Sequence, residues 1–181
     1  GDTNAAGPKQ STGQKYGRTM PDNAPYTSRV FELQKDWIDF NGHLNMAYYT
    51  VLFDRAYEEV GESLGMGAHY AATRRLTTYT AEIHLSYVRE LHLSDRVRGT
   101  YQLLDHDEKR LHSYQELRHA DEGWLAATCE TMTLHIDMSG PKVTPFPRDV
   151  LERVEAMRTL HATLETPARA GRSIAIRRRK S

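Results

Sequence analysis

The sequence predicts an α+β fold in which one long central helix packs against a curved antiparallel sheet. Residues 44–64 carry apolar side chains spaced by three and four, the period of a helix that buries one broad face. Four later runs read as strands, and short turn-forming segments separate them. A chain of 181 residues is long enough to bury one core of this kind.

The N-terminal part of the chain contains the expected first strand and the long helix. Residues 1–25 are polar, with little apolar periodicity, so we expect a disordered tail or a vector-derived segment there. A strand is expected over 26–33, followed by a polar loop and the helix. Gly65 is the expected end of that helix, and residues 66–76 are expected to form a loop or a short helix.

The C-terminal part contains the expected sheet. Strands are predicted over 77–90, 97–104, 110–119 and 124–137, and we expect them to form a four-stranded antiparallel meander. Pro147 opens a last helix, with apolar positions recurring up to Leu164. The expected domain therefore spans 26–164, and residues 165–181 are expected to form a basic, solvated C-terminal tail.

The composition narrows the class of protein. Lys and Arg together number 24, as do Asp and Glu, so no overall charge directs the chain toward nucleic acid or an anionic membrane. No apolar stretch approaches the length of a membrane span. The single cysteine, Cys129, lies in a strand-like run, where we expect it to be buried, and it fits a reducing compartment. A cytoplasmic protein that binds a small ligand is expected.

Two kinds of catalytic site have no motif in this chain. The nine histidines form neither His-Glu-x-x-His nor a Cys/His cluster, so neither a metal nor another cofactor is expected. The Gly-x-Ser-x-Gly motif of serine hydrolases is also missing from the sequence.

The densest polar segment is Asp39-Phe40-Asn41-Gly42-His43-Leu44-Asn45, directly before the long helix. One interpretation is structural: Asn41 or Asn45 caps the helix, and Asp39 suits the positive end of its dipole. That interpretation leaves His43 unexplained. The other interpretation is that these polar groups carry out chemistry at the mouth of the helix.

This segment fits the pattern Asp-x-x-Gly-His-x-Asn, and over residues 26–164 the chain resembles the hotdog-fold acyl-CoA thioesterases of the 4-hydroxybenzoyl-CoA thioesterase type. Segments 79–84, 87–90, 107–112 and 170–174 are more specifically similar to the betainyl-CoA thioesterase group of carnitine catabolism. Members of that group can be fused to a carnitine dehydrogenase, but no Gly-x-Gly-x-x-Gly follows a strand here. The resemblance implies a homodimer or a dimer of dimers, with sites between protomers.

The resemblance also implies roles for the motif. Asp39 would be the catalytic carboxylate, either as nucleophile or as general base. The backbone amides near Asn45 and Met46 would polarise the thioester carbonyl. Gly42 would provide a positive φ or a close approach of the ligand. His43 either orients Asp39 or the substrate or bonds locally, and Asn45 is either a cap or a substrate orienter.

A betainyl substrate would need a place for its trimethylammonium head, which aromatic faces and one carboxylate hold best. The rings available are Trp37, Tyr48, Tyr49, Tyr79 and Tyr87, and Glu82 is the candidate anion. The alternative is that these rings are core residues and Glu82 is solvated.

Further charged residues complete the expected site. Arg89, Lys109 and Arg110 are candidates for the CoA phosphates. Glu58 and Glu59 lie late in the long helix, far from Asp39 in the same chain, and are expected to be surface charges. The resemblance thus implies a betainyl-CoA thioesterase. The alternatives are a thioesterase for another short or aromatic acyl-CoA, and a noncatalytic acyl-CoA or acyl-carrier binding module.

Overall fold

The computed structural model describes residues 24–178, so the tail expected at residues 1–23 lies outside the described part of the chain. The elements are β1 (Tyr26–Glu32), the one-turn helix η1 (Lys35–Trp37), α1 (Met46–Ser63), α2 (Ala68–Arg74), β2 (Leu76–Tyr87), β3 (Arg96–His106), β4 (Arg110–His119), β5 (Leu125–Asp137), β6 (Lys142–Val143) and α3 (Arg148–His161). Each expected strand and helix is present, and the segment expected as a loop or short helix forms α2.

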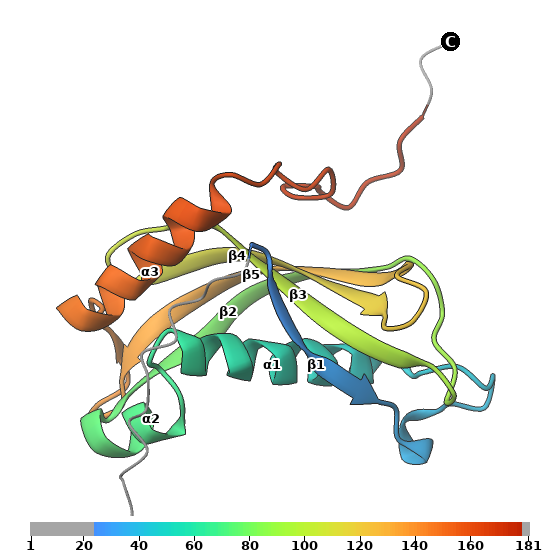
Figure 1. Cartoon of the computed structure of the whole chain (residues 1–181), viewed down its shortest axis with the longest axis horizontal. Helices are drawn as coiled ribbons and strands as arrows, with labels where there is room; N and C mark the ends of the chain where they lie inside the picture. The colour runs from blue at the N-terminus through green and yellow to red at the C-terminus, as the bar shows by residue number, and fades with distance from the viewer. Residues whose placement is uncertain (1–23, 179–181) are drawn as a thin grey trace, which may run out of the picture.

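The sheet curves around α1, which lies along its concave face (Figure 1). The strand order is β1-β3-β4-β5-β2, every pairing is antiparallel, and β6 adds to the end of β5. A single long helix inside one curved antiparallel sheet is the hotdog fold that the sequence predicted.

The expected four-stranded meander is wrong in one respect. Strand β2 pairs with β5 from Leu76 to Tyr87 and not with β3, so only β3, β4 and β5 form a meander. Alternation of apolar and polar residues predicts that a strand exists, but not which strand it pairs with. The connecting residues 88–95 carry the chain from β2 at one edge of the sheet to β3, and the other side of β2 has no partner in the described chain.

Two apolar clusters fix α1 in the sheet. Near its N-terminus Leu52 and Phe53 pack with residues of β1, β3, β4 and β5, and near its C-terminus Val60 and Leu64 pack with residues of α3. Helix α3 also packs against the part of β3 that extends beyond its pairing with β1, where the buried Leu103 amide donates to Nδ1 of His161 at 2.9 Å. Together the two clusters hold α1 so that its N-terminal end lies beside the polar motif.

Cys129 lies on β5 and is buried, which confirms the prediction made for this residue.

Residues 165–173, here called the C-terminal strap, cross the face of the sheet opposite α1 (Figure 1). The Gln102 side chain donates to the Glu165 carbonyl at 3.1 Å, and the Gly171 amide donates to Oε2 of Glu130 at 2.8 Å. The other carboxylate oxygen of Glu130 is 2.8 Å from Nε2 of His112. Backbone groups at both ends of residues 165–171 therefore bond to the sheet, although no residue of this segment is buried.

No helix within residues 24–178 is both long enough and apolar enough to cross a membrane.

A buried histidine joins α2, β5 and the segment after β6. His135 is fully buried; its Nδ1 lies 2.8 Å from the Thr144 carbonyl, and its Nε2 lies 2.7 Å from the Tyr70 hydroxyl. Since a carbonyl only accepts, Nδ1 carries the proton and Nε2 accepts from Tyr70. Burial lowers the pKa of His135 and raises the pKa of Tyr70 to about 12, so both side chains are neutral near pH 7.

This network predicts a loss of stability in mild acid. The unfolded chain protonates His135 near its ordinary pKa of 6.5, whereas the folded chain protonates it only at lower pH. The stabilisation is therefore complete above pH 6.5 and falls as the pH drops below it. Urea unfolding between pH 8 and pH 5 should show a smaller acid-induced loss in His135→Gln than in the parent chain. The exposed control His69→Gln should keep the parent slope; an unchanged slope in His135→Gln would contradict the assignment.

Candidate active site

The polar motif forms a tight loop that is bonded to itself and to the link after β2. The Asp39 amide donates to the His43 carbonyl at 2.9 Å, and the Gly42 amide donates to the Asp39 carbonyl at 3.0 Å. The Leu44 amide then donates to the Leu91 carbonyl at 2.8 Å. These bonds hold the loop between the start of α1 and residues 88–95.

Backbone amides hold the carboxylate of Asp39, and this residue lines a cavity. Its Oδ1 accepts from the Asn41 amide at 2.9 Å and from the His43 amide at 3.3 Å. Within residues 24–178 no hydrogen bond is made to Oδ2. The cavity has a volume of about 360 Å³, and we call it the Asp39 cavity. It is lined by Asp39, His43, Leu44, Met46, Tyr49, Tyr87, Val88, Arg89 and Glu90.

The start of α1 offers one backbone donor to this cavity. Asn45 is the N-cap, and its Oδ1 accepts from the Ala47 amide at 3.0 Å. The Asn45 amide is itself used, because it donates to the Trp37 carbonyl at 2.9 Å. The expectation that the Asn45 amide polarises a carbonyl is therefore wrong. The Met46 amide has no acceptor in the described chain, as expected for the first residue of a helix, and it remains available.

Gly42 and His43 differ in what the structure supports. Gly42 has a φ of +78°, which accounts for a glycine at this position, and within the described chain nothing lies within 4 Å of the position its Cβ would take. The His43 ring meets the His92 ring edge to face at 5.0 Å. Within the described chain the His43 imidazole makes no hydrogen bond to Asp39, and both a role toward substrate and a purely local role stay predictions.

Two of the expected aromatic residues lie at the site. Tyr49 is buried, and its hydroxyl accepts from the Leu91 amide at 3.3 Å. Tyr87 meets Tyr49 edge to face at 5.0 Å and donates its hydroxyl to the Met46 carbonyl at 3.0 Å. Burial raises the pKa of Tyr49, and nearby Tyr87 and Glu90 act in the same direction, so its hydroxyl stays neutral.

The other expected cage residues do not join them within one chain. Trp37 is buried, and its ring already contacts the Tyr48 ring at 5.4 Å and the Arg55 guanidinium at 5.0 Å. Trp37 and Tyr48 are thus packing residues. Glu82 precedes Tyr87 by five residues, about 16 Å along an extended strand, and Tyr79 lies farther away. Glu82 lines a different cavity, together with residues of the C-terminal strap.

The candidate CoA contacts are also divided. Arg89 lines the Asp39 cavity, with its guanidinium 4.0 Å from the centre of the Trp124 ring. Lys109 and Arg110 lie at the start of β4, and Arg110 pairs with Asp107 at 2.6 Å. The site is at the other end of β4, about 30 Å away along an extended strand of this length. Lys109 and Arg110 therefore do not reach the site in the same chain.

The link formed by residues 88–95 contains functional positions that sequence reasoning missed. Leu91 bonds both the motif loop and Tyr49, and Glu90 lines the Asp39 cavity. Asp95 accepts from the His92 amide at 2.8 Å and lies 3.3 Å from Nε2 of His119. The only sequence cue was this cluster of charged and imidazole side chains directly after the edge strand.

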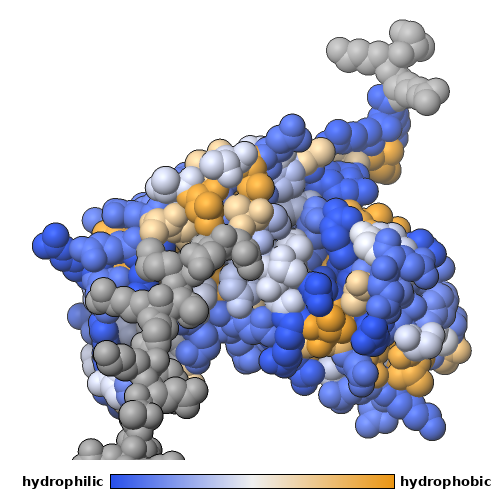
Figure 2. Space-filling model, viewed as in Figure 1, coloured by the Kyte–Doolittle hydropathy of each residue, from blue (hydrophilic) through white to orange (hydrophobic). Residues whose placement is uncertain are grey.

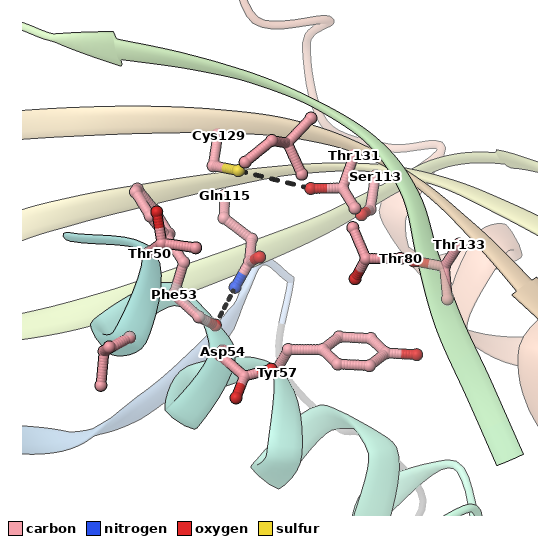
Figure 3. A pocket seen from close by; sticks show the side chains of 12 residues that line it. Thr50, Phe53, Asp54, Tyr57, Thr80, Ser113, Gln115, Cys129, Thr131 and Thr133 are labelled. Atoms are coloured by element: carbon pink, nitrogen blue, oxygen red, sulfur yellow. Dashed lines mark hydrogen bonds between the residues drawn. The ribbon is translucent and has the colours of Figure 1, made fainter. Parts of the chain in front are cut away.

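A second cavity of about 250 Å³ follows α1 away from the motif, between the helix and the inner faces of β2, β4 and β5 (Figure 3). We call it the helix-side cavity. Its helix wall includes Thr50, Asp54 and Tyr57, and Gln115 donates from the opposite wall to the Phe53 carbonyl at 3.1 Å. It begins about one helical turn beyond Met46, so the two cavities are neighbours along α1.

The end of the molecule that carries the Asp39 cavity also exposes apolar side chains. Phe40 is 97% exposed and Met46 65% exposed, and Tyr87, Val88 and Leu93 are exposed as well. Figure 2 shows hydrophobic surface at the lower right, the end at which the segment between β1 and α1 lies in Figure 1.

Comparison with known proteins identifies the class. The sequence profile of the thioesterase-like superfamily matches residues 33–154, and the chain belongs to this superfamily. A betainyl-CoA thioesterase of Pseudomonas aeruginosa is 36% identical over 141 residues, covering 78% of this chain and 89% of that protein. An L-carnitine dehydrogenase/betainyl-CoA thioesterase of Rhizobium meliloti is 32% identical over 142 residues, and the match spans only 28% of that longer protein.

Solved structures agree with the fold. A Staphylococcus aureus protein in complex with CoA superposes with a TM-score of 0.78 at 28% identity, covering 84% of this chain and 96% of that one. A putative thioesterase of Pseudomonas putida gives a TM-score of 0.74 at 28% identity, covering 85% and 98%. A DHNA-CoA thioesterase of Staphylococcus aureus shares the fold at 16% identity, with a TM-score of 0.69 and coverage of 76% and 94%.

Gly42→Ala tests whether the loop geometry positions the carboxylate. An alanine with a φ of +78° should cost about 1–2 kcal/mol and shift the loop, lowering turnover of acyl-CoA. The matched control is Gly140→Ala, where added Cβ also meets nothing within 4 Å and no positive φ is required. Thermal unfolding and a thiol-release assay measure both effects. Equal behaviour of the two variants would contradict the role given to Gly42.

Proposed function

We propose that this protein hydrolyses acyl-CoA thioesters and that its substrate is betainyl-CoA, which yields glycine betaine and CoA. The observation that supports this most strongly is the pairing of two groups in one cavity. Two backbone amides fix the Asp39 carboxylate, and the unused Met46 amide stands at the N-terminus of α1 beside it. Thioester hydrolysis needs a carboxylate of this kind and a donor for the developing oxyanion.

In the proposed reaction the thioester carbonyl oxygen accepts from the Met46 amide, and the helix dipole adds to the stabilisation of negative charge. As general base, Asp39 takes a proton from a water whose oxygen bonds to the carbonyl carbon. As nucleophile, Asp39 bonds to that carbon itself, and water later cleaves the resulting anhydride. In both routes the carbon–sulfur bond breaks and the CoA thiolate leaves, taking up a proton.

The choice of betainyl-CoA is supported by the relative from Pseudomonas aeruginosa, which is similar over most of both chains. We also propose a role in carnitine catabolism, a carnitine dehydrogenase as functional neighbour and a cytoplasmic location; the names of the fused relatives support the first two. The name of the longer Rhizobium meliloti relative gives both an L-carnitine dehydrogenase and a betainyl-CoA thioesterase for one polypeptide. A CoA-bound structural neighbour is consistent with a CoA ester as the ligand.

A second candidate function has its own support. The helix-side cavity, at about 250 Å³, has room for an acyl group larger than betaine, such as an aromatic ring. A thioesterase for an aromatic acyl-CoA would use this space, whereas betainyl-CoA would leave it for other parts of the ligand. The noncatalytic binding module remains the third alternative, in which Asp39 only shapes the loop.

We also propose that the protein works as a homodimer joined along β2, alone or in a dimer of dimers. Strand β2 has twelve residues and lies at the edge of the sheet, with exposed Tyr79 and Ile83 on it. A long unpaired edge is a template for another strand. Antiparallel pairing with a second copy would bring the Leu76 end of one β2 toward the Tyr87 end of the other, and so toward the exposed apolar residues around the site.

Asp39→Asn tests the proposed chemistry directly. It keeps the size of the side chain and an oxygen for the Asn41 amide but removes the charge, so thiol release from betainyl-CoA should fall by at least about a hundredfold. The melting temperature should change little, and this control separates chemistry from folding. The thioesters assayed are betainyl-CoA, acetyl-CoA and benzoyl-CoA. Retained turnover in Asp39→Asn would exclude the mechanism, and preference for benzoyl-CoA would favour the second candidate.

Ile83→Lys tests the dimer. Placing a lysine on the unpaired edge opposes like charges across the proposed two-fold axis, so sedimentation should show a shift from dimer to monomer. Turnover is not used as the readout, because Ile83 also lines the helix-side cavity. The matched control Val143→Lys changes an exposed apolar residue on β6 and should remain dimeric. A parent chain that sediments as a monomer, or a dimeric Ile83→Lys, would count against this interface.

A further inference from the structure

The position of the reacting carbonyl limits where the cationic head of betainyl-CoA can lie; this inference rests on the proposed function. Standard bond lengths put the ammonium nitrogen about 2.5 Å from the carbonyl carbon. A carbonyl oxygen bonded to the Met46 amide then leaves that nitrogen within roughly 7 Å of the amide. The head therefore lies in or beside the Asp39 cavity, and the groups that line this cavity are the first candidates to hold it.

Two other carboxylates near α1 or β2 stand outside the Asp39 cavity within one chain. Asp54 lies eight residues beyond Met46, about 12 Å along the helix axis. Glu82 lies five residues before Tyr87, about 16 Å along the strand. Neither of them lines the Asp39 cavity.

Glu90 does line that cavity, and its backbone is fixed on both sides. The Val88 and Arg89 amides donate to the Ala126 carbonyl at 2.9 and 3.0 Å, and the Leu91 amide donates to the Tyr49 hydroxyl at 3.3 Å. Glu90 is also close enough to Tyr49 to raise the pKa of that phenol. It therefore stands beside the tyrosine pair as a second carboxylate, separate from Asp39.

Tyr87 is the aromatic face best placed for a cation. Its hydroxyl is tied to the Met46 carbonyl at 3.0 Å, and its contact with Tyr49 is edge to face, so the ring is held in place. The side chain is 46% exposed and borders the cavity, which leaves ring surface open to a ligand. A quaternary ammonium has no N–H to donate, so a ring face and a carboxylate are the groups that recognise it. Arg89, the cation lining the same cavity, is stacked on Trp124 at 4.0 Å.

We infer that Glu90 and the ring of Tyr87 form the subsite for the trimethylammonium head and so determine selectivity for a cationic acyl group. Glu82, the carboxylate that the sequence suggested, has no part in this subsite. The thioester carbonyl at Met46 and the head at Glu90 would then share one small cavity.

The test compares two thioesters of the same shape: betainyl-CoA and 3,3-dimethylbutanoyl-CoA, in which a carbon replaces the ammonium nitrogen. The parent protein should prefer betainyl-CoA in kcat/KM. Glu90→Gln and Tyr87→Leu should each lower kcat/KM for betainyl-CoA about tenfold and change that for the neutral ester about twofold or less. Tyr87→Phe keeps the ring and should keep the preference, as should Glu82→Gln and the exposed α3 control Glu155→Gln.

Three results would overturn the subsite: a parent protein without preference between the two esters, an equal loss on both esters in Glu90→Gln, or a selective loss in Glu82→Gln. Each of these leaves acyl-CoA hydrolysis standing. A parent protein that hydrolyses neither ester would overturn the proposed function together with the subsite, so the two failures are distinguishable.

Discussion

The hydrogen bond from the Leu44 amide to the Leu91 carbonyl is the contact on which the site depends. It joins two loops that would otherwise be separate: the motif loop before α1 and the link after β2. Through it, one side of the Asp39 cavity comes from the start of the helix and the other side from the end of the edge strand. The same link brings Leu91 to Tyr49 and Glu90 to the cavity, so a single short segment supplies both the support and the polar lining.

The sequence predicted the elements well because each carries its own local pattern. The helix period around Leu52 and the alternation along β4 depend only on nearby residues, and Asn45 and Gly42 have backbone roles that their residue types suggest. What failed depended on long-range pairing. The position of β2 beside β5 belongs to the order of strands in the sheet, and the bond of Gly171 to Glu130 joins residues 41 positions apart. No local pattern encodes that order.

The candidate site shows the same division. Asp39, His43 and Met46 are neighbours in sequence, and the structure keeps them together at one cavity. The ring residues were grouped by type, and packing separates them: Trp37 is stacked in the core, whereas Tyr49 and Tyr87 meet at the site. Residue type alone does not distinguish a ring whose faces are covered by other side chains from a ring with an open face.

The C-terminal strap changes where the folding unit ends. The superfamily profile stops at residue 154, in the middle of α3, yet Met157 and His161 are fully buried and the Gly171 amide is bonded to the sheet. On the face beneath the strap, Tyr114 is 4% exposed. A fragment trimmed to the profile would lack Met157 and His161, half of the buried residues of α3, together with the two strap contacts to the sheet. Similarity to the superfamily therefore marks out a shorter segment than the one that packs together here.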